Sequence, residues 1–174
     1  VDAGEARECC GWNVGRSGVW FPEGGFARAP SVVRALLSCA AAVPGSQFQA
    51  NARVERLSRG NDVWTAADAH GRVLTAAPVV VLANATDLAR LAPLGATLRS
   101  VRGQVSYVPA AKATAPRAVV IGHGYALPAI DGRIVVGSSY DLESNEPAPT
   151  RDAHEGNLAR LRALSPGADF RGDA

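Results

Sequence analysis

The residues best suited to hold a ligand follow or interrupt two apolar stretches of this sequence. Ala83-Asn84-Ala85 directly follows the apolar run at residues 78–82, and Gly103-Gln104 lies inside the apolar stretch 98–109. Short side chains after a buried strand let a ligand approach the carboxyl end of that strand. A glycine inside a strand marks a bulge or a close approach of backbone and ligand. From spacing alone, a plain strand–loop junction and a purely structural bulge stay open as alternatives.

Three further side chains could contact such a ligand. The Gln104 amide can hydrogen-bond a heterocycle, and the Tyr125 hydroxyl can donate into a pocket, although both residue types also occur in ordinary strands. Arg99 and Arg102 flank Gly103, and because they are three residues apart on a strand they point to opposite faces. At most one of these two arginines therefore faces a ligand.

Hydrolytic and metal chemistry find no support in the residue pattern. The three histidines have no spacing that suits a metal ion or a nucleophile relay, so we expect them at the surface. No serine stands in a nucleophile elbow. Gly122 and Gly124 begin like a dinucleotide fingerprint, but Leu127 replaces its third glycine and a strand follows.

The bulk composition is that of a globular chain. The sequence has 174 residues, of which 47% are hydrophobic and 20% charged, and a net charge of +2. That charge is below what a dedicated nucleic-acid-binding domain carries, although the positive charges are nearly all arginines and leave a phosphate-facing patch open. No apolar run approaches the roughly 18 residues of a membrane span. Without a secretory signal and with an odd cysteine count, the sequence points to the cytoplasm.

Two segments have helical periodicity. Residues 30–43 begin with Pro30 and place apolar residues at helical spacing before a Pro-Gly stop. Residues 150–165 carry acidic residues early, arginines late, and Leu158, Leu161 and Leu164 three apart, which predicts an amphipathic helix.

The other segments predict strands. Residues 47–55 alternate apolar and polar side chains, and two short runs after them complete a β-meander. Residues 79–82 are apolar throughout, which is typical of a strand covered on both faces. After residue 98 the sequence predicts four short antiparallel strands, with a hairpin turn at Asp131-Gly132.

The order of these motifs resembles the FAD-dependent amino-acid oxidase superfamily, which includes glycine oxidase and sarcosine oxidase. A closer resemblance is to the bifunctional tRNA 5-methylaminomethyl-2-thiouridine biosynthesis family (MnmC). The GVWFPEGG stretch at residues 18–25 is similar to the entry into that family's substrate domain, and residues 78–88 to its second flavin-domain strand and turn. Residues 101–109 and 122–141 are similar to its substrate-domain strands.

The resemblance implies a mixed α/β fold, with part of an FAD-binding Rossmann-like domain and an antiparallel substrate domain of the amino-acid oxidase type. Residues 1–46 would be the entry and helix of the substrate domain, residues 47–92 part of the FAD-binding domain, and residues 93–174 the remaining substrate domain.

The resemblance also implies site residues. Val54 would contact the adenine side of FAD, Ala83, Asn84 and Ala85 its diphosphate–ribose side, and Gly103 and Gln104 the isoalloxazine. Tyr125 is the first candidate for the substrate pocket and Arg102 the second.

The implied activity is an FAD-dependent oxidation in tRNA modification. It removes the carboxymethyl group of 5-carboxymethylaminomethyl(-2-thio)uridine, which leaves the aminomethyl base and glyoxylate. Two alternatives stay open: an oxidase of free glycine, sarcosine or a D-amino acid, and a non-catalytic module that binds tRNA or a partner protein.

Three features of the family do not occur in these residues. They are the Gly-x-Gly-x-x-Gly phosphate loop, a later arginine- and glycine-bearing segment, and the methyltransferase domain that uses S-adenosylmethionine. Ala85 also stands where many relatives have glycine. We therefore expect this chain by itself to hold no flavin and to be inactive.

Overall fold

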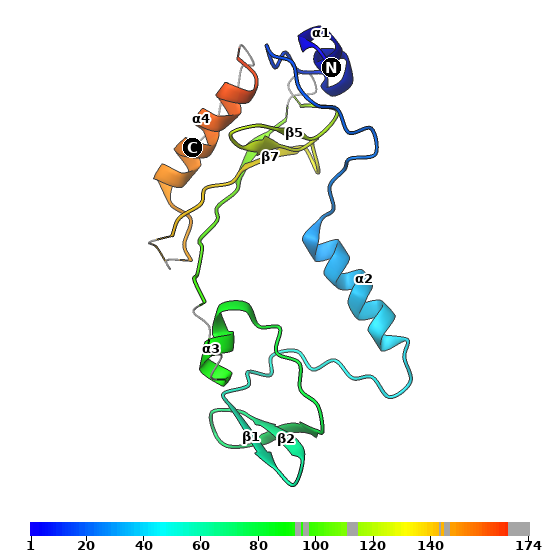
Figure 1. Cartoon of the computed structure of the whole chain (residues 1–174), viewed down its shortest axis with the longest axis vertical. Helices are drawn as coiled ribbons and strands as arrows, with labels where there is room; N and C mark the ends of the chain where they lie inside the picture. Colours follow the sequence, from blue (N-terminus) through cyan, green and yellow to red (C-terminus); the bar gives the residue numbers. More distant parts are fainter. Residues whose placement is uncertain (93–94, 96–97, 111–114, 143, 145–146, 167–174) are drawn as a thin grey trace. The chain divides into compact units, whose positions relative to one another are not determined.

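A computed structural model describes residues 1–92, 95, 98–110, 115–142, 144 and 147–166 (Figure 1). The chain forms two compact units, of which unit 1 comprises Val1–Ala27 and Val101–Ala174, and unit 2 comprises Arg28–Ser100. Each unit combines helices with antiparallel strands, which confirms the predicted mixed α/β class. Within the described ranges, no helix has the length and apolar character to cross a membrane.

Unit 1 is built on a four-stranded antiparallel sheet with the strand order β4-β7-β6-β5. Its strands are β4 (Ser106–Pro109), β5 (Val120–Ile121), β6 (Tyr125–Ala126) and β7 (Arg133–Gly137). The predicted hairpin turn is confirmed, since Ile130 pairs with Arg133 around Asp131-Gly132. Asp131 and Gly132 have φ angles of 50° and 74°, the left-handed conformations that a tight hairpin requires.

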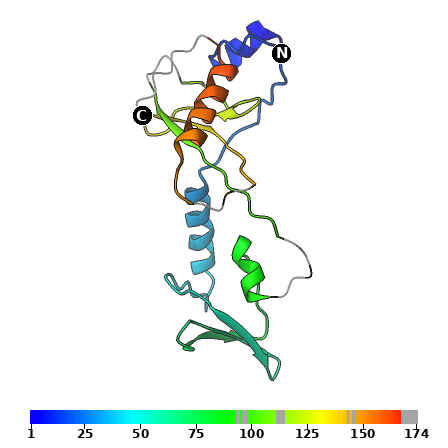
Figure 2. The ribbon, with the colours of Figure 1, turned by 90° about the vertical axis from the view of Figure 1, so that its left-hand side faces the viewer.

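Helix α4 (Arg151–Leu164) covers one face of this sheet, as Figure 2 shows from the side. Thr150 caps its first turn by accepting a hydrogen bond from the Ala153 N–H. The leucines predicted for the apolar stripe are buried, and they form the core of unit 1 with side chains from β4, β6 and β7. Leu161 and Ile134 are both fully buried at the centre of this core.

Helix α1 (Ala3–Cys10) also belongs to unit 1 and was not predicted. Asp2 and Glu5 form a reciprocal capping box at its start, and Gly11 ends it with a φ of 77°. Cys10 reaches the core, and its carbonyl oxygen accepts a hydrogen bond of 2.7 Å from the Arg117 N–H. The Asp-x-x-Glu spacing was the available signal for this helix.

Unit 2 contains a three-stranded meander of β1 (Arg56–Gly60), β2 (Val63–Ala67) and β3 (Val73–Ala77). The meander is confirmed, but its first strand is not at the predicted residues 47–55. Asn51 has a φ of 55°, which interrupts the extended conformation there, so the strand begins only at Arg56.

Helix α2 (Ala29–Ala41) confirms the helix predicted at residues 30–43, with Pro30 in its first turn. None of its residues is buried, and Leu36 on its apolar stripe is 64% exposed. The short elements η1 (Ala85–Asp87) and α3 (Leu88–Leu91) complete unit 2.

The strand predicted at residues 79–82 does not form. Val79 is 73% exposed and Val81 is 83% exposed, and no backbone hydrogen bond within the described residues pairs this segment with another. A run that is apolar throughout becomes a central strand only when strands pair with both of its edges. Among the described residues of unit 2, the only sheet is the meander, which ends at Ala77.

Candidate ligand-binding site

The sheet of unit 1 has one face that α4 does not cover. Along β4, Ser106 and Val108 are buried on the α4 side, whereas Tyr107 between them is 59% exposed on the other side. Residues directly paired across antiparallel strands share a face. Tyr107 pairs with Val135, and Tyr125 pairs with Gly137, so both tyrosines lie on the uncovered side.

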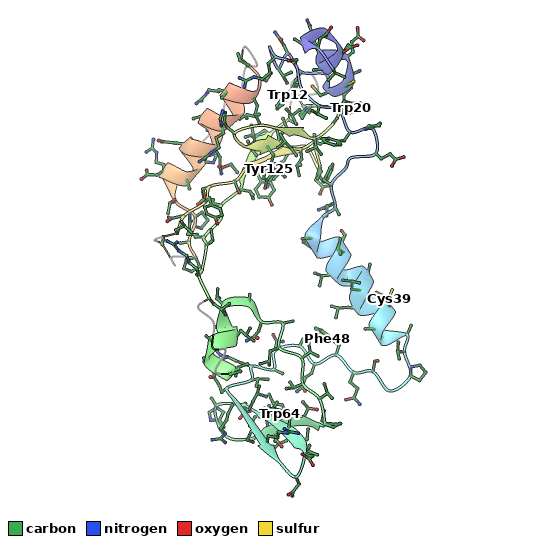
Figure 3. All side chains as sticks on the ribbon, viewed as in Figure 1. Trp12, Trp20, Cys39, Phe48, Trp64 and Tyr125 are labelled. Carbon is green, nitrogen blue, oxygen red and sulfur yellow. The ribbon has the colours of Figure 1, made fainter. Side chains whose placement is uncertain are left out.

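We call this surface the open face. Its members are the residues that pair with Tyr107 or Tyr125 across neighbouring strands, together with alternate residues along the same strands. They are Gly103, Val105, Tyr107, Ile121, Tyr125, Val135, Gly137 and Tyr140. Figure 3 labels Tyr125 among the strands of unit 1.

Gly103 leaves room at one end of the open face. A Cβ atom added to Gly103 would lie 3.5 Å from the carbonyl oxygen of Ser139, an ordinary contact, and would meet no other atom within 4 Å. The fold therefore does not require a glycine here for lack of space. Because Gly103 has no side chain, its backbone is accessible at this end of the face, and the contact with a flavin stays a prediction.

Gln104 and Arg102 point to the α4 side of the sheet. Gln104 Oε1 accepts hydrogen bonds from Arg102 Nη2 and from the Thr150 N–H, each 2.8 Å long, and Gln104 Nε2 donates to the Thr150 carbonyl oxygen at 2.9 Å. Arg102 Nη2 also donates to the Ala148 carbonyl oxygen at 2.6 Å. Of the four site candidates in unit 1, only Gly103 and Tyr125 thus share the open face.

A polar network below Gln104 fixes α4 to the sheet. Asn157 Nδ2 donates to the Gln104 carbonyl oxygen at 2.8 Å and to Ser106 Oγ at 3.2 Å, and His154 Nδ1 lies 2.9 Å from the same Ser106 oxygen. His154, which was expected at the surface, is therefore half-buried. Ser106 is almost fully buried and already bonded, so this serine–histidine pair holds the helix and is not a nucleophile.

In unit 2, Arg90 joins the two segments that were predicted to contact FAD. Arg90 Nη2 donates to the Val54 carbonyl oxygen at 3.0 Å, and Nη1 lies 2.5 Å from Glu55 Oε2. Nη2 also lies 3.5 Å from Asp87 Oδ2, one turn beyond Asn84. The sequence analysis did not single out Arg90. Its position three residues after Asp87 was the only indication of a contact with that carboxylate.

The turn at Asn84-Ala85 has two features that fit a bound cofactor. Asn84 Oδ1 is buried without a hydrogen-bond partner, and such an acceptor calls for a donor, as a ribose hydroxyl would be. Ala85 has a φ of 50°, in the left-handed region that favours glycine. Ala83 precedes this turn and is exposed. These residues fit the diphosphate–ribose part of FAD.

A cavity of about 170 Å³ in unit 1 lies between α1, β5 and the end of α4. Its walls are mostly apolar, with Cys10, Arg16 and His123 as the charged or titratable side chains. Neither Gly103 nor Tyr125 lines this cavity. In the part of the chain that the structure describes, no cluster of histidine, cysteine or acidic residues could hold a metal ion.

Comparisons with known proteins agree with this picture. The profile of the family described as FAD dependent oxidoreductase matches residues 1–173. The tRNA 5-methylaminomethyl-2-thiouridine biosynthesis bifunctional protein MnmC of Burkholderia multivorans is 42% identical over 168 residues, which cover 96% of this chain and 25% of that protein.

Two further relatives carry the same name. The protein of Ralstonia nicotianae is 42% identical over 173 residues, which cover 95% of this chain and 26% of the relative. The protein of an Azoarcus species is 42% identical over 170 residues, with coverages of 96% and 26%. The chain thus spans about a quarter of the length of these relatives.

Proposed function

Because this chain belongs to the FAD dependent oxidoreductase family, we propose that it supplies part of the flavin and substrate sites of an oxidase that modifies tRNA. The observation that carries the tRNA assignment is the 42% identity, over nearly the whole chain, to proteins named for tRNA 5-methylaminomethyl-2-thiouridine biosynthesis. The accessible backbone of Gly103 on the open face supports a flavin there.

The proposed reaction removes the carboxymethyl group of 5-carboxymethylaminomethyl(-2-thio)uridine at a CH–NH bond. FAD, when bound, supplies the two-electron oxidant that accepts a hydride from the carbon between the amine and the carboxylate. Water then hydrolyses the resulting imine to the aminomethyl base and glyoxylate. Such a reaction depends on how the amine and that carbon are positioned more than on a side-chain base.

The proposed cofactor contacts in unit 2 are Val54 and the turn Ala83-Asn84-Ala85. Asn84 Oδ1 would accept a hydrogen bond from a ribose hydroxyl, which would satisfy its buried oxygen. Val54 would contact the adenine side, and Arg90 would keep its segment next to the turn.

The proposed contacts in unit 1 divide between the two sides of the sheet. Gly103 would lie next to the isoalloxazine and Tyr125 in the substrate pocket. Gln104 is the other proposed neighbour of the flavin. Because its side-chain amide is hydrogen-bonded to Thr150, it would not contact the flavin directly but would position the segment that carries Gly103. Arg102 is the weaker carboxylate candidate, since its guanidinium already donates to Gln104 and Ala148.

For the whole protein we propose a cytoplasmic enzyme whose substrate is tRNA. The relatives are named as bifunctional proteins and are about four times as long as this chain. We propose that a methyltransferase domain using S-adenosylmethionine accompanies the oxidase.

A chimera tests this function. In it, these 174 residues replace the matching region of the full-length Burkholderia multivorans relative. We expect glyoxylate from tRNA that carries carboxymethylaminomethyl-uridine, and little product from free glycine, sarcosine or D-alanine. Faster oxidation of a free amino acid would favour the amino-acid oxidase alternative. A folded chimera that binds tRNA and oxidises nothing would favour the binding module.

A further inference from the structure

We propose that Arg90 is a positioning residue for the ADP part of FAD. Its ion pair with Glu55 sets the spacing between Val54 and the turn Ala83-Asn84-Ala85, all within unit 2. Both are contacts of the proposed function, on which this inference rests. Arg90 would act on the affinity for the cofactor without touching it.

Glu55 attaches one end of this link to the meander. The Glu55 N–H donates to the carbonyl oxygen of Ala67 on β2 at 2.8 Å, directly before the first paired residue of β1. Ala67 is buried in unit 2. Val54 precedes Glu55 in the chain, so the place of its carbonyl oxygen follows from the same pairing.

Arg90 lies at the other end, on the short helical segment that follows the turn. The Asp87 N–H donates to the Asn84 carbonyl oxygen at 3.2 Å, and α3 with Arg90 continues from there. Among the described residues, the buried Oδ1 of Asn84 has no hydrogen-bond partner. A shift of Arg90 relative to the meander would therefore move the acceptor that we assign to a ribose hydroxyl.

The guanidinium of Arg90 joins the two ends. Nη1 lies 2.5 Å from Glu55 Oε2, and Nη2 donates to the Val54 carbonyl oxygen at 3.0 Å. Within the described ranges, every hydrogen bond from η1 and α3 to the rest of unit 2 comes from this side chain. The side chains of Arg90 and Glu55 are 32% and 30% exposed, so water screens their attraction only in part.

The two bonds depend on the shape of an arginine. A planar guanidinium donates to a carboxylate and to a carbonyl oxygen in a fixed geometry, whereas a lysine ammonium is a compact charge on a flexible stem. With Arg90 in place, both cofactor contacts are held at one spacing before FAD binds. Less of the binding free energy is then spent on ordering them.

The test titrates FAD into the flavin-free chimera and follows the flavin fluorescence. Arg90→Ala should raise the Kd for FAD about 5- to 50-fold, because a charge-assisted hydrogen bond and a half-shielded ion pair are lost. ADP, used as a competing ligand, should lose affinity by the same factor. Arg90→Lys should give a smaller loss, since the charge beside Glu55 remains.

Arg53→Ala is the matched control. Arg53 Nε lies 2.6 Å from the other carboxylate oxygen of Glu55, but this pair joins residues two positions apart and does not reach the turn. We expect an unchanged Kd for FAD in this variant. In the variant that combines Arg90→Ala with Glu55→Ala, the loss should be no larger than in Arg90→Ala alone, because both changes break the same link.

Amide exchange in the isolated 174-residue chain separates positioning from a general loss of stability. Arg90→Ala should speed the exchange of the Asp87 and Leu88 N–H groups, which bond within the turn, and leave β2 unchanged. Faster exchange throughout β2 would mean that Arg90 holds the whole unit, and would overturn the positioning role. If Arg90→Ala does not fold, Arg90→Lys and Glu55→Ala carry the same comparison.

The titration also separates this inference from the proposed function. An unchanged chimera that binds no FAD would reject both. A chimera that binds FAD with the same Kd after Arg90→Ala would reject only the role of Arg90. An equal loss in Arg53→Ala, or a loss for FAD without one for ADP, would likewise overturn that role and leave the flavin site standing.

Discussion

The side-chain amide of Gln104 pairs with both backbone groups of Thr150, the residue that caps α4. Its Nε2 donates to the Thr150 carbonyl oxygen at 2.9 Å, and its Oε1 accepts from the Thr150 N–H at 2.8 Å. One side chain thus makes the two hydrogen bonds that a neighbouring strand would make. This pairing fixes the start of α4 on one side of the sheet and leaves the open face uncovered.

Replacing Gln104 by alanine should therefore loosen the start of α4. The Thr150 N–H loses its partner, and the Thr150 carbonyl oxygen keeps only the hydrogen bond from the His154 N–H, so we expect a loss of about 1–3 kcal/mol in the free energy of unfolding. Urea denaturation measures this loss, and faster amide exchange in the first turn of α4 locates it. Gln49→Ala, at an exposed position of unit 2, is the control. Unchanged stability in Gln104→Ala would contradict the pairing.

Leucines on α4 and α2 should respond differently to truncation. Leu161 is fully buried against the sheet, so Leu161→Ala should cost about 2–5 kcal/mol. Leu36 on α2 is exposed, and Leu36→Ala should change the stability of the isolated chain by less than about 0.5 kcal/mol. Thermal or urea unfolding of the two variants makes the comparison. A similar loss in both would mean that α2 is packed in solution.

Two glycines of unit 1 should tolerate alanine unequally. A Cβ on Gly124 would lie 3.0 Å from the Gly137 carbonyl oxygen and 3.1 Å from Arg160 Cδ, so Gly124→Ala should cost about 1–3 kcal/mol. Gly103→Ala meets only an ordinary contact and should leave the stability of the isolated chain unchanged. Unfolding curves of both variants test this.

The same glycine should matter for the cofactor. In the chimera, Gly103→Val should reduce the amount of flavin bound per chain with little change in the free energy of unfolding. The valine side chain would lie between the backbone of residue 103 and the isoalloxazine ring. Flavin absorbance and unfolding are measured on the same preparation. Normal flavin content with lost stability would show that Gly103 is only structural.

The turn that joins β2 to β3 should weaken in acid. Desolvation raises the pKa of Asp68, but hydrogen bonds from the Arg72 and His70 N–H groups and the Arg72 guanidinium outweigh it, so the pKa lies below its ordinary value of 3.8. Because the pKa of Asp68 is lower in the folded chain than in the unfolded chain, the ionised carboxylate stabilises the turn fully above pH 3.8. This stabilisation is lost as the pH falls through the pKa of the folded chain.

Amide exchange in residues 68–72, followed from neutral pH into that acid range, measures this loss. Asp68→Asn should remove the pH dependence, since the amide does not titrate there. The same acid transition in Asp68→Asn would show that another group is responsible.

Local signals were sufficient for several elements. Pro30 and the leucine spacing predicted α2 and α4, and the Asp131-Gly132 pair predicted its hairpin, because each depends on residues close in sequence. The strand that the sequence predicted at residues 79–82 does not form. A central strand depends on neighbouring strands, and the described part of unit 2 does not supply them.

The candidate site was predictable only in part. The structure places Gly103 and Tyr125 together on the open face, and their contacts with a flavin and a substrate stay predictions. Gln104 and Arg102 were found as residue types, but their hydrogen bonds run to residues 148–150, which no sequence spacing reveals. Arg90 was not singled out because its contacts with Glu55 and Val54 join residues that are 35 and 36 positions apart in the sequence.

The central claim is that this chain contributes part of a flavin site. The direct measurement is the flavin absorbance per chain of the folded chimera, beside that of the isolated 174-residue chain. We predict about one FAD per chimera and none in the isolated chain. A folded chimera that stays colourless after incubation with FAD would contradict the claim.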